Sequence, residues 1–195
     1  MDIDNKERIL GILLKEPFKT HTTTSIAEAL KITRQGAWKA LNKLEEDSII
    51  YLKPISKAKT GTITISLNWS NPVTEKNLSL ILTKEALKQE RWRINFEEVE
   101  NKTYFLILFG SILTKPKQAN DIDIIAVTDK KNFKKIEEAI IKIQKTQIKK
   151  IHIIDLTKEE FKEELKTENK AYINAVKNGV VLYGQDNFIN SIRDL

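Results

Sequence analysis

The chain has 195 residues, of which 41% are hydrophobic and 31% charged, and its formal net charge is +6. A chain of this length can bury one large core or two small ones, so the composition favours a soluble globular protein. Cysteine is absent and His21 and His152 are the only histidines, which excludes a disulfide framework and thiolate zinc sites. We therefore expect any bound metal to rest on oxygen ligands.

No segment of the sequence is typical of a membrane protein. The longest apolar run, residues 104–113, is far shorter than the roughly 20 residues that cross a bilayer. Met1 is followed by acidic residues and not by a basic and apolar leader. These features predict a cytoplasmic protein with no membrane partner. Residues 31–59 hold seven basic side chains against three acidic ones, and this local excess suggests a polyanionic partner.

Three helices are predicted in the first part of the chain. Asp4 is a suitable N-cap for an opening helix whose leucine and isoleucine residues recur at helical spacing. Two short amphipathic helices follow in tandem. The first is opened by Thr24 or Ser25, and the second is capped by Thr33 after a tight turn.

A β-hairpin and a linker are predicted next. Two runs of β-forming residues, 48–55 and 62–69, flank Gly61, which suits a hairpin turn. A polar helix opened by Thr83 then forms part of a linker at 76–100. Beyond this linker strands and helices alternate, which is typical of an α/β fold. The strands are predicted at 104–109, 121–127, 151–156 and 180–183, and the helices at 130–146, 158–166 and 169–178.

The second helix of the tandem pair is predicted to present polar and basic side chains outward. When Ala37, Leu41 and Leu44 turn inward, helical geometry exposes Arg34, Gln35, Trp38, Lys39 and Asn42. Arginine pairs with guanine, and glutamine or asparagine pairs with adenine. Phosphate contacts are expected from Lys39, Lys43, Lys53, Lys57 and Lys59. Trp38 suits either a contact to a thymine methyl or sugar, or an interface with other apolar groups.

The order of helix, short turn, second helix and hairpin in residues 25–52 resembles the winged-helix family. The resemblance implies a winged helix-turn-helix whose second helix reads double-stranded DNA. A winged helix that docks on another protein is the alternative. Because winged-helix regulators usually read two half-sites, we expect a homodimer.

A pattern suited to a metal and a phosphate lies in the C-terminal part. The apolar strand at 104–109 ends in Gly110 and Ser111, nine residues follow, and the next strand then opens with Asp121 and Asp123. Residues two apart in a strand face the same side, so both carboxylates project from one face. Adjacent like charges favour a bound cation, and hard oxygen ligands favour Mg²⁺. A glycine followed by a serine lets the backbone, a hydroxyl and an amide approach a phosphate.

This pattern resembles the DNA polymerase beta-type nucleotidyltransferase superfamily, in particular its small prokaryotic members called minimal nucleotidyltransferases. The resemblance spans roughly residues 84–184 and implies a mixed sheet flanked by helices. It implies that the triphosphate of a nucleotide is held by Gly110 and Ser111, and the loop of this chain offers Lys115 and Lys117 as further nucleotide-binding residues. It also implies that Asp121 and Asp123 are catalytic residues that bind Mg²⁺.

Two departures from the family's pattern bear on catalysis. The loop lacks the glycine and arginine often seen after Gly-Ser, and Asn120 replaces the usual serine. Active members also carry a third carboxylate on a later strand. In our preferred register of residues 151–156 His152 takes that position, while Asp155 needs another register or a bulge to reach it. Both are candidate catalytic residues; a neutral pocket histidine and a helix N-cap are their structural alternatives.

Together these patterns predict a two-domain α+β or α/β protein with a winged helix at 1–75, a linker helix at 76–100 and a nucleotidyltransferase-like domain at 101–195. The first functional hypothesis is a transcription regulator whose second domain binds a magnesium nucleoside triphosphate. Because toxin-antitoxin modules are a family context for both parts, this regulator is antitoxin-like or autoregulatory. The alternative is an active nucleotidyltransferase that transfers a nucleoside monophosphate to a hydroxyl of a protein, a tRNA or a small molecule.

Overall fold

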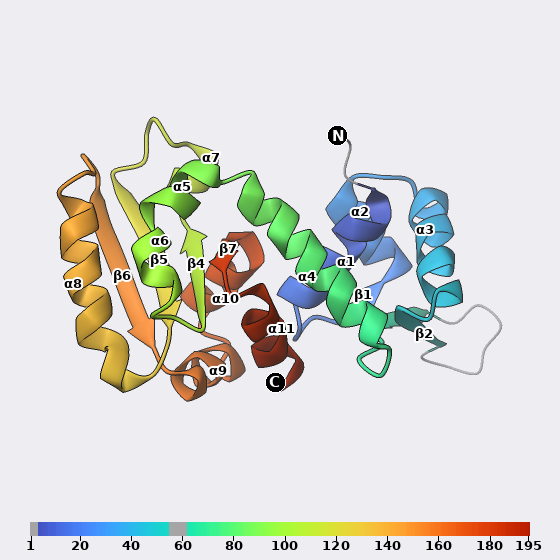
Figure 1. Cartoon of the computed structure of the whole chain (residues 1–195). Helices are drawn as coiled ribbons and strands as arrows, with labels where there is room; N and C mark the ends of the chain where they lie inside the picture. The colour runs from blue at the N-terminus through green and yellow to red at the C-terminus, as the bar shows by residue number, and fades with distance from the viewer. Residues whose placement is uncertain (1–3, 55–61) are drawn as a thin grey trace. The chain divides into compact units, whose positions relative to one another are not determined.

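The structure is a computed structural model, and it describes residues 4–54 and 62–195. The chain has a mixed α and β fold and divides into two compact units, Met1–Ile81 and Leu82–Leu195 (Figure 1). In the part of the chain that the structure describes, no helix is long and apolar enough to cross a membrane.

The first unit combines three helices with a small antiparallel sheet. Its elements are α1 (Asn5–Lys15), β1 (His21–Thr22), α2 (Thr23–Leu30), α3 (Arg34–Glu46), β2 (Ile50–Pro54) and β3 (Ile63–Leu67). The strand order is β1-β3-β2, and both pairings are antiparallel. The three helices contact one another around a core whose fully buried side chains include Ile9, Leu14, Ile26, Ala37, Leu41 and Ile50. The helices and the hairpin strands predicted from the sequence are thereby confirmed.

Side-chain caps set where these helices begin. The Asp4 carboxylate accepts a hydrogen bond from the Lys6 amide at 3.3 Å, and the Thr33 hydroxyl accepts one from the Gly36 amide at 3.0 Å, as predicted. The predicted opening of α2 at Thr24 or Ser25 is wrong. Thr22 is the N-cap and forms a reciprocal capping box with Ser25. Because Thr22 is held in extended conformation by its pairing with β3, the helix starts directly after β1.

The linker contains more than one helix. α4 (Pro72–Leu87) passes without a break through Thr83, so the prediction of a helix opened by Thr83 is wrong. Its start is favoured by Pro72, which suits the first helical position because no hydrogen bond from its nitrogen is needed there. The side chain of Asn71 accepts a hydrogen bond from the Val73 amide at 2.9 Å. Two short helices follow, α5 (Glu90–Asn95) and α6 (Glu97–Glu100).

The second unit is built on a four-stranded mixed sheet. Its further elements are β4 (Phe105–Phe109), α7 (Ser111–Thr114), β5 (Asp121–Val127), the 3-10 turn η1 (Lys130–Asn132), α8 (Phe133–Gln144), β6 (Lys150–Leu156), α9 (Lys158–Lys166), α10 (Lys170–Asn178), β7 (Val180–Tyr183) and α11 (Gln185–Arg193). The strand order is β6-β5-β4-β7; β5 and β6 are parallel, and β4 is antiparallel to β5 and β7. All four strands lie where the sequence predicts them. The final helix, α11, is not among the predicted elements.

Helices cover both faces of this sheet. On one face, Ile122 and Ile124 of β5 belong to a buried cluster with Ile136 and Ile140 of α8 and residues of α5 and α6. On the other face, the Phe105 ring packs edge-on against rings of α9 and α11, with centroid distances of 5.1 Å and 5.6 Å. Because alternate residues of β5 supply the two faces, the strand is fixed in register by both cores.

Candidate functional site

The outer face of α3 carries the polar side chains that the sequence analysis selected. Ala37, Ala40, Leu41 and Leu44 are buried, so the opposite side of the helix faces solvent. The exposed residues on it include Arg34, Gln35, Trp38, Lys39 and Lys43, and Asn42 is half-buried. These side chains offer the donors and acceptors that contact base edges and phosphates.

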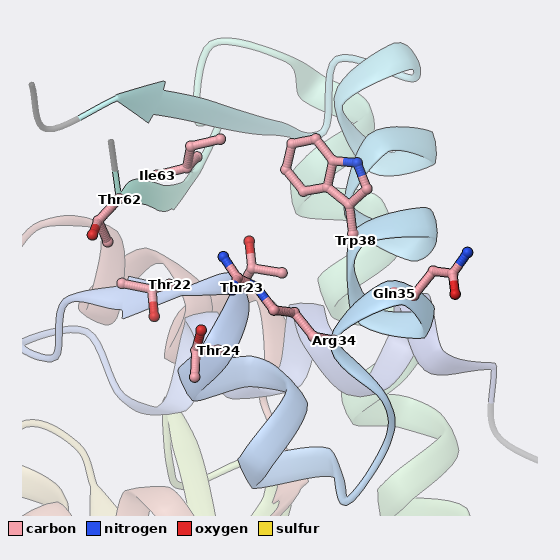
Figure 2. A pocket seen from close by; sticks show the side chains of 8 residues that line it. All are labelled: Thr22, Thr23, Thr24, Arg34, Gln35, Trp38, Thr62 and Ile63. Carbon is pink, nitrogen blue, oxygen red and sulfur yellow. The ribbon is translucent and has the colours of Figure 1, made fainter. Parts of the chain in front are cut away.

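An open groove of about 490 Å³ begins at this face (Figure 2). Its walls come from the start of α2, the first turns of α3 and the start of β3. The residues that line it are Thr22, Thr23, Thr24, Arg34, Gln35, Trp38, Thr62 and Ile63. Figure 2 shows the Arg34 side chain extending towards the threonines at the start of α2. Trp38 is 37% exposed, so it forms a wall of the groove and is not a core residue.

The hairpin supplies one described basic residue to this unit's surface. Lys53 is exposed on β2, and its amine lies 5.2 Å from the centre of the Tyr51 ring. The predicted phosphate contacts Lys57 and Lys59, and the predicted turn residue Gly61, lie outside the described residues.

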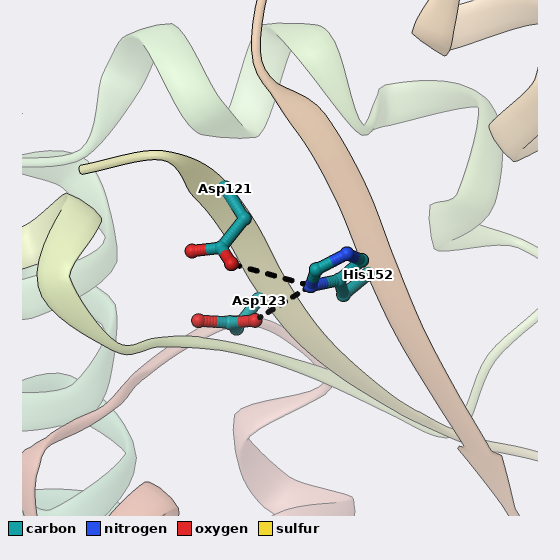
Figure 3. A group of neighbouring side chains, drawn as sticks. All are labelled: Asp121, Asp123 and His152. Carbon is teal, nitrogen blue, oxygen red and sulfur yellow. Dashed lines mark ion pairs between the residues drawn. The ribbon is translucent and has the colours of Figure 1, made fainter.

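In the second unit, two carboxylates and an imidazole meet at one end of the sheet (Figure 3). Asp121 and Asp123 project from the same face of β5, and the parallel register places His152 of β6 beside Asp123. The His152 Nδ1 atom lies 3.4 Å from Asp121 Oδ2 and 3.5 Å from Asp123 Oδ1. One ligand atom from each residue lies within 4.8 Å of the others, a spacing that one metal ion can bridge.

The charge on Asp123 is unfavourable in this setting. Partial burial is the main cause that raises the pKa of Asp123 above its ordinary value, and the neighbouring Asp121 carboxylate raises it further. His152 acts in the opposite direction through its charge and its hydrogen bond. A cation between the two carboxylates would oppose both unfavourable effects.

Gly110 is required by its neighbour across the sheet. Its φ of +83° is a conformation that side chains rarely adopt, and a Cβ atom there would lie 2.4 Å from Asp123 Oδ2. The glycine thus makes room for one of the carboxylates. Ser111 opens the short α7, and Ser111, Lys115 and Lys117 are all exposed on the connection from β4 to β5.

Asp155 is not part of this group. It pairs with Ala126, three residues beyond His152, and therefore lies on the opposite face of the sheet and further along it. The predicted register with His152 beside the carboxylates is confirmed, and the alternative register that would bring Asp155 there is wrong. The N-cap of α9 is Thr157, which forms a capping box with Glu160.

Two positioning residues were not found from the sequence. The Lys149 amine donates a hydrogen bond to the Ala119 carbonyl, which ties the start of β6 to the loop before Asp121. Gln144, at the end of α8, accepts a hydrogen bond from the Ile151 amide at 2.8 Å and donates one to the Lys149 carbonyl at 3.0 Å. Together they hold the strand end that carries His152. No sequence motif marks either residue, because their partners are backbone atoms.

Comparisons with known proteins are limited to distant structural similarity. No family model and no curated protein matches the sequence. The chain is similar to MepR, a transcription regulator of the Staphylococcus aureus multidrug efflux pump MepA, with 22% identity and a TM-score of 0.35 over 45% of this chain and 64% of MepR. It is similar to Lactococcus lactis ZitR, with 25% identity and a TM-score of 0.33 over 52% of this chain and 62% of ZitR.

The heme sensor protein PefR from Streptococcus agalactiae, solved in complex with heme, is similar at 13% identity and a TM-score of 0.35, over 74% of each chain. The chain spans less than two thirds of the MepR structure and of the ZitR structure matched at 25% identity. With TM-scores below 0.5, these similarities establish neither the fold nor the function of this chain.

Proposed function

We propose that the first unit binds double-stranded DNA and that the chain is a transcription regulator. The observation that supports this function is the solvent-facing side of α3. Arg34 and Gln35 lie at the start of the helix, where side chains of a docked helix reach base edges, and Lys39 and Lys43 follow at a spacing that suits phosphates. Lys53, which is exposed on the hairpin, would add a phosphate contact.

Salt dependence of binding to a duplex tests this function. Each phosphate contact contributes about 0.9 to the slope of log affinity against log salt, so a Lys39→Ala, Lys43→Ala double variant should reduce that slope by about 1.8. A matched control is Lys134→Ala with Lys135→Ala, which removes two exposed lysines from α8 in the second unit and should leave the slope unchanged. Absence of duplex binding by the full chain even at low salt would instead favour a protein-docking winged helix.

We further propose that the second unit binds a divalent cation together with a nucleoside triphosphate, and that this site makes the regulator nucleotide-responsive or autoregulatory. The favouring observation is that Asp121 and Asp123 converge beside the strand end at Gly110 and Ser111. Their carboxylate oxygens suit Mg²⁺, the ion that the family resemblance implies, whereas the neighbouring imidazole is not a ligand that Mg²⁺ prefers. The cation would neutralise charge on the triphosphate. Ser111, Lys115 and Lys117 would contact its oxygens.

Nucleotidyl transfer should be slow or absent, since an imidazole occupies the position of the third carboxylate. Calorimetry of the full chain with Mg²⁺ and each nucleoside triphosphate should give binding heat that disappears in an Asp121→Ala, Asp123→Ala double variant. Transfer from α-labelled nucleotides to the protein itself, to tRNA and to small hydroxyl compounds tests catalysis. Rapid labelling that depends on His152 would make this chain an enzyme with a histidine base.

A further inference from the structure

We infer that Asp121, Asp123 and His152 form a site that selects a divalent transition ion over Mg²⁺, with His152 Nδ1 as a direct ligand. The inference rests on the proposed cation site and names the ion that this site prefers. It revises the expectation of a site with oxygen ligands only.

The distances from the imidazole nitrogen to the two carboxylates fit the coordination sphere of one small ion. Metal–ligand bonds of about 2.1 Å place neighbouring ligands about 3.0 Å apart in octahedral geometry and about 3.4 Å apart in tetrahedral geometry. His152 Nδ1 lies 3.4 Å and 3.5 Å from the two carboxylate oxygens. The imidazole nitrogen is therefore already as far from each carboxylate oxygen as two ligands of one tetrahedral ion are from each other, and all three ligand atoms lie within 4.8 Å of one another.

The ligands are also held by rigid elements. Asp121 and Asp123 lie on β5 and His152 on β6, the register of these strands is continuous over seven residue pairs, and the Gln144 side chain fixes the start of β6. The three side chains are still 34%, 27% and 46% exposed in that order, which leaves coordination positions open for water or phosphate oxygens.

The donor set decides which ion is preferred. Mg²⁺ takes oxygen ligands and gives up its water reluctantly, whereas imidazole suits transition ions such as Fe²⁺ and Zn²⁺. Mn²⁺ takes the same carboxylate ligands as Mg²⁺ but also accepts an imidazole nitrogen, so a comparison of these two ions isolates the contribution of the nitrogen donor. Replacing a third carboxylate by an imidazole removes one negative charge and adds one nitrogen donor. The loss of charge weakens the binding of any divalent cation. The nitrogen donor offsets this loss of affinity only for ions that bind nitrogen well.

Mn²⁺ and Mg²⁺ titrations of the full chain, without nucleotide, test the inference. Mn²⁺ binding, followed by the electron paramagnetic resonance signal of the free ion, should be at least about tenfold tighter than Mg²⁺ binding measured by competition. Pulsed resonance spectra of bound Mn²⁺ should show coupling to the nitrogen of a coordinated imidazole.

Two substitutions of the histidine separate its role from general charge effects. His152→Gln should abolish the nitrogen coupling and weaken Mn²⁺ binding at least about tenfold, with a smaller effect on Mg²⁺. His152→Asp should restore a set of three carboxylates, tighten Mg²⁺ binding and narrow the preference for Mn²⁺. Glu138→Gln, which removes an exposed acidic side chain of α8, should change neither Mn²⁺ binding nor Mg²⁺ binding. Melting curves without metal check that each variant folds.

The outcomes distinguish this inference from the function on which it rests. Binding that depends on Asp121 but shows no nitrogen coupling and no preference for Mn²⁺ would overturn the inference and leave the cation site standing. If neither ion binds the wild type, with or without a nucleoside triphosphate, both are wrong, and the imidazole only bridges and neutralises the two carboxylates.

Discussion

The ionised Asp123 carboxylate, which the proposed cation site needs, is unfavourable for the stability of the folded chain. Partial burial and the Asp121 carboxylate both raise its pKa, so the ionised form at neutral pH is destabilising in the folded chain without a cation. Asp123→Asn should therefore raise the melting temperature of the chelator-treated protein by a few degrees, the shift expected for roughly 1 kcal/mol or less in a unit of this size. Differential scanning calorimetry in EDTA measures this change.

At the proposed cation site, an added divalent cation should stabilise the wild type, and the same substitution should remove that stabilisation. Asp155→Asn is the matched control on the opposite face of the sheet, and it should leave the response to the cation unchanged. A lower melting temperature for Asp123→Asn in EDTA would mean that His152 already more than compensates the two negative charges.

Most of this residue-level geometry follows from strand periodicity. The common face of Asp121 and Asp123 and the position of His152 beside them could be predicted, because a period of two and a parallel register determine both. The role of His152 as a metal ligand, which we infer, could not be predicted. A count of two histidines argues against a site made of histidines, but it does not exclude a single imidazole that β6 places next to a carboxylate pair. The contacts of Gln144 and Lys149 could not be predicted from the sequence, because their hydrogen-bond partners are backbone atoms.

Among the elements, α2 shows how a neighbouring strand sets a helix start. Thr22 ends β1 and caps α2, so Thr22→Ala should destabilise this helix by about 1 kcal/mol. Thr24→Ala, which changes an exposed threonine two residues on, should have little effect. Amide hydrogen exchange of α2 in the two variants measures the difference. Equal protection in both would show that β1 does not fix the helix start.

The strands of the second unit could be predicted because each is a short apolar run, and packing of both faces favours such runs. Helix boundaries were harder. α4 starts at Pro72 because proline suits the first turn, although the same residue also suits a loop. α11 was not predicted, and its role in the fold is evident from the burial of Phe188, Ile189 and Ile192 and from the contact of Phe188 with Phe105.

On the scale of the whole molecule, α4 presents an apolar stripe that the described chain leaves in contact with solvent. Val73, Leu80 and Leu87 are 52%, 52% and 56% exposed. They lie seven residues apart, a spacing that keeps side chains on nearly the same side of a helix. Burying such a stripe against a second copy would remove three large side chains from water, at about 25 cal/mol per Å² of apolar surface.

We therefore expect a homodimer in solution that associates through α4. Light scattering should give a mass near 45 kDa, twice the 22.5 kDa of one chain, and Leu80→Lys should return the mass to that of one chain. Ile148→Lys, which changes a fully exposed apolar residue that lies outside α4, is the control and should remain dimeric. Because two DNA-binding units in one dimer can contact two half-sites, Leu80→Lys should also weaken binding to a duplex with paired sites more than binding to a single half-site. A wild-type mass of one chain across micromolar concentrations would rule out this dimer, and the stripe would then have to be covered by another protein or left exposed.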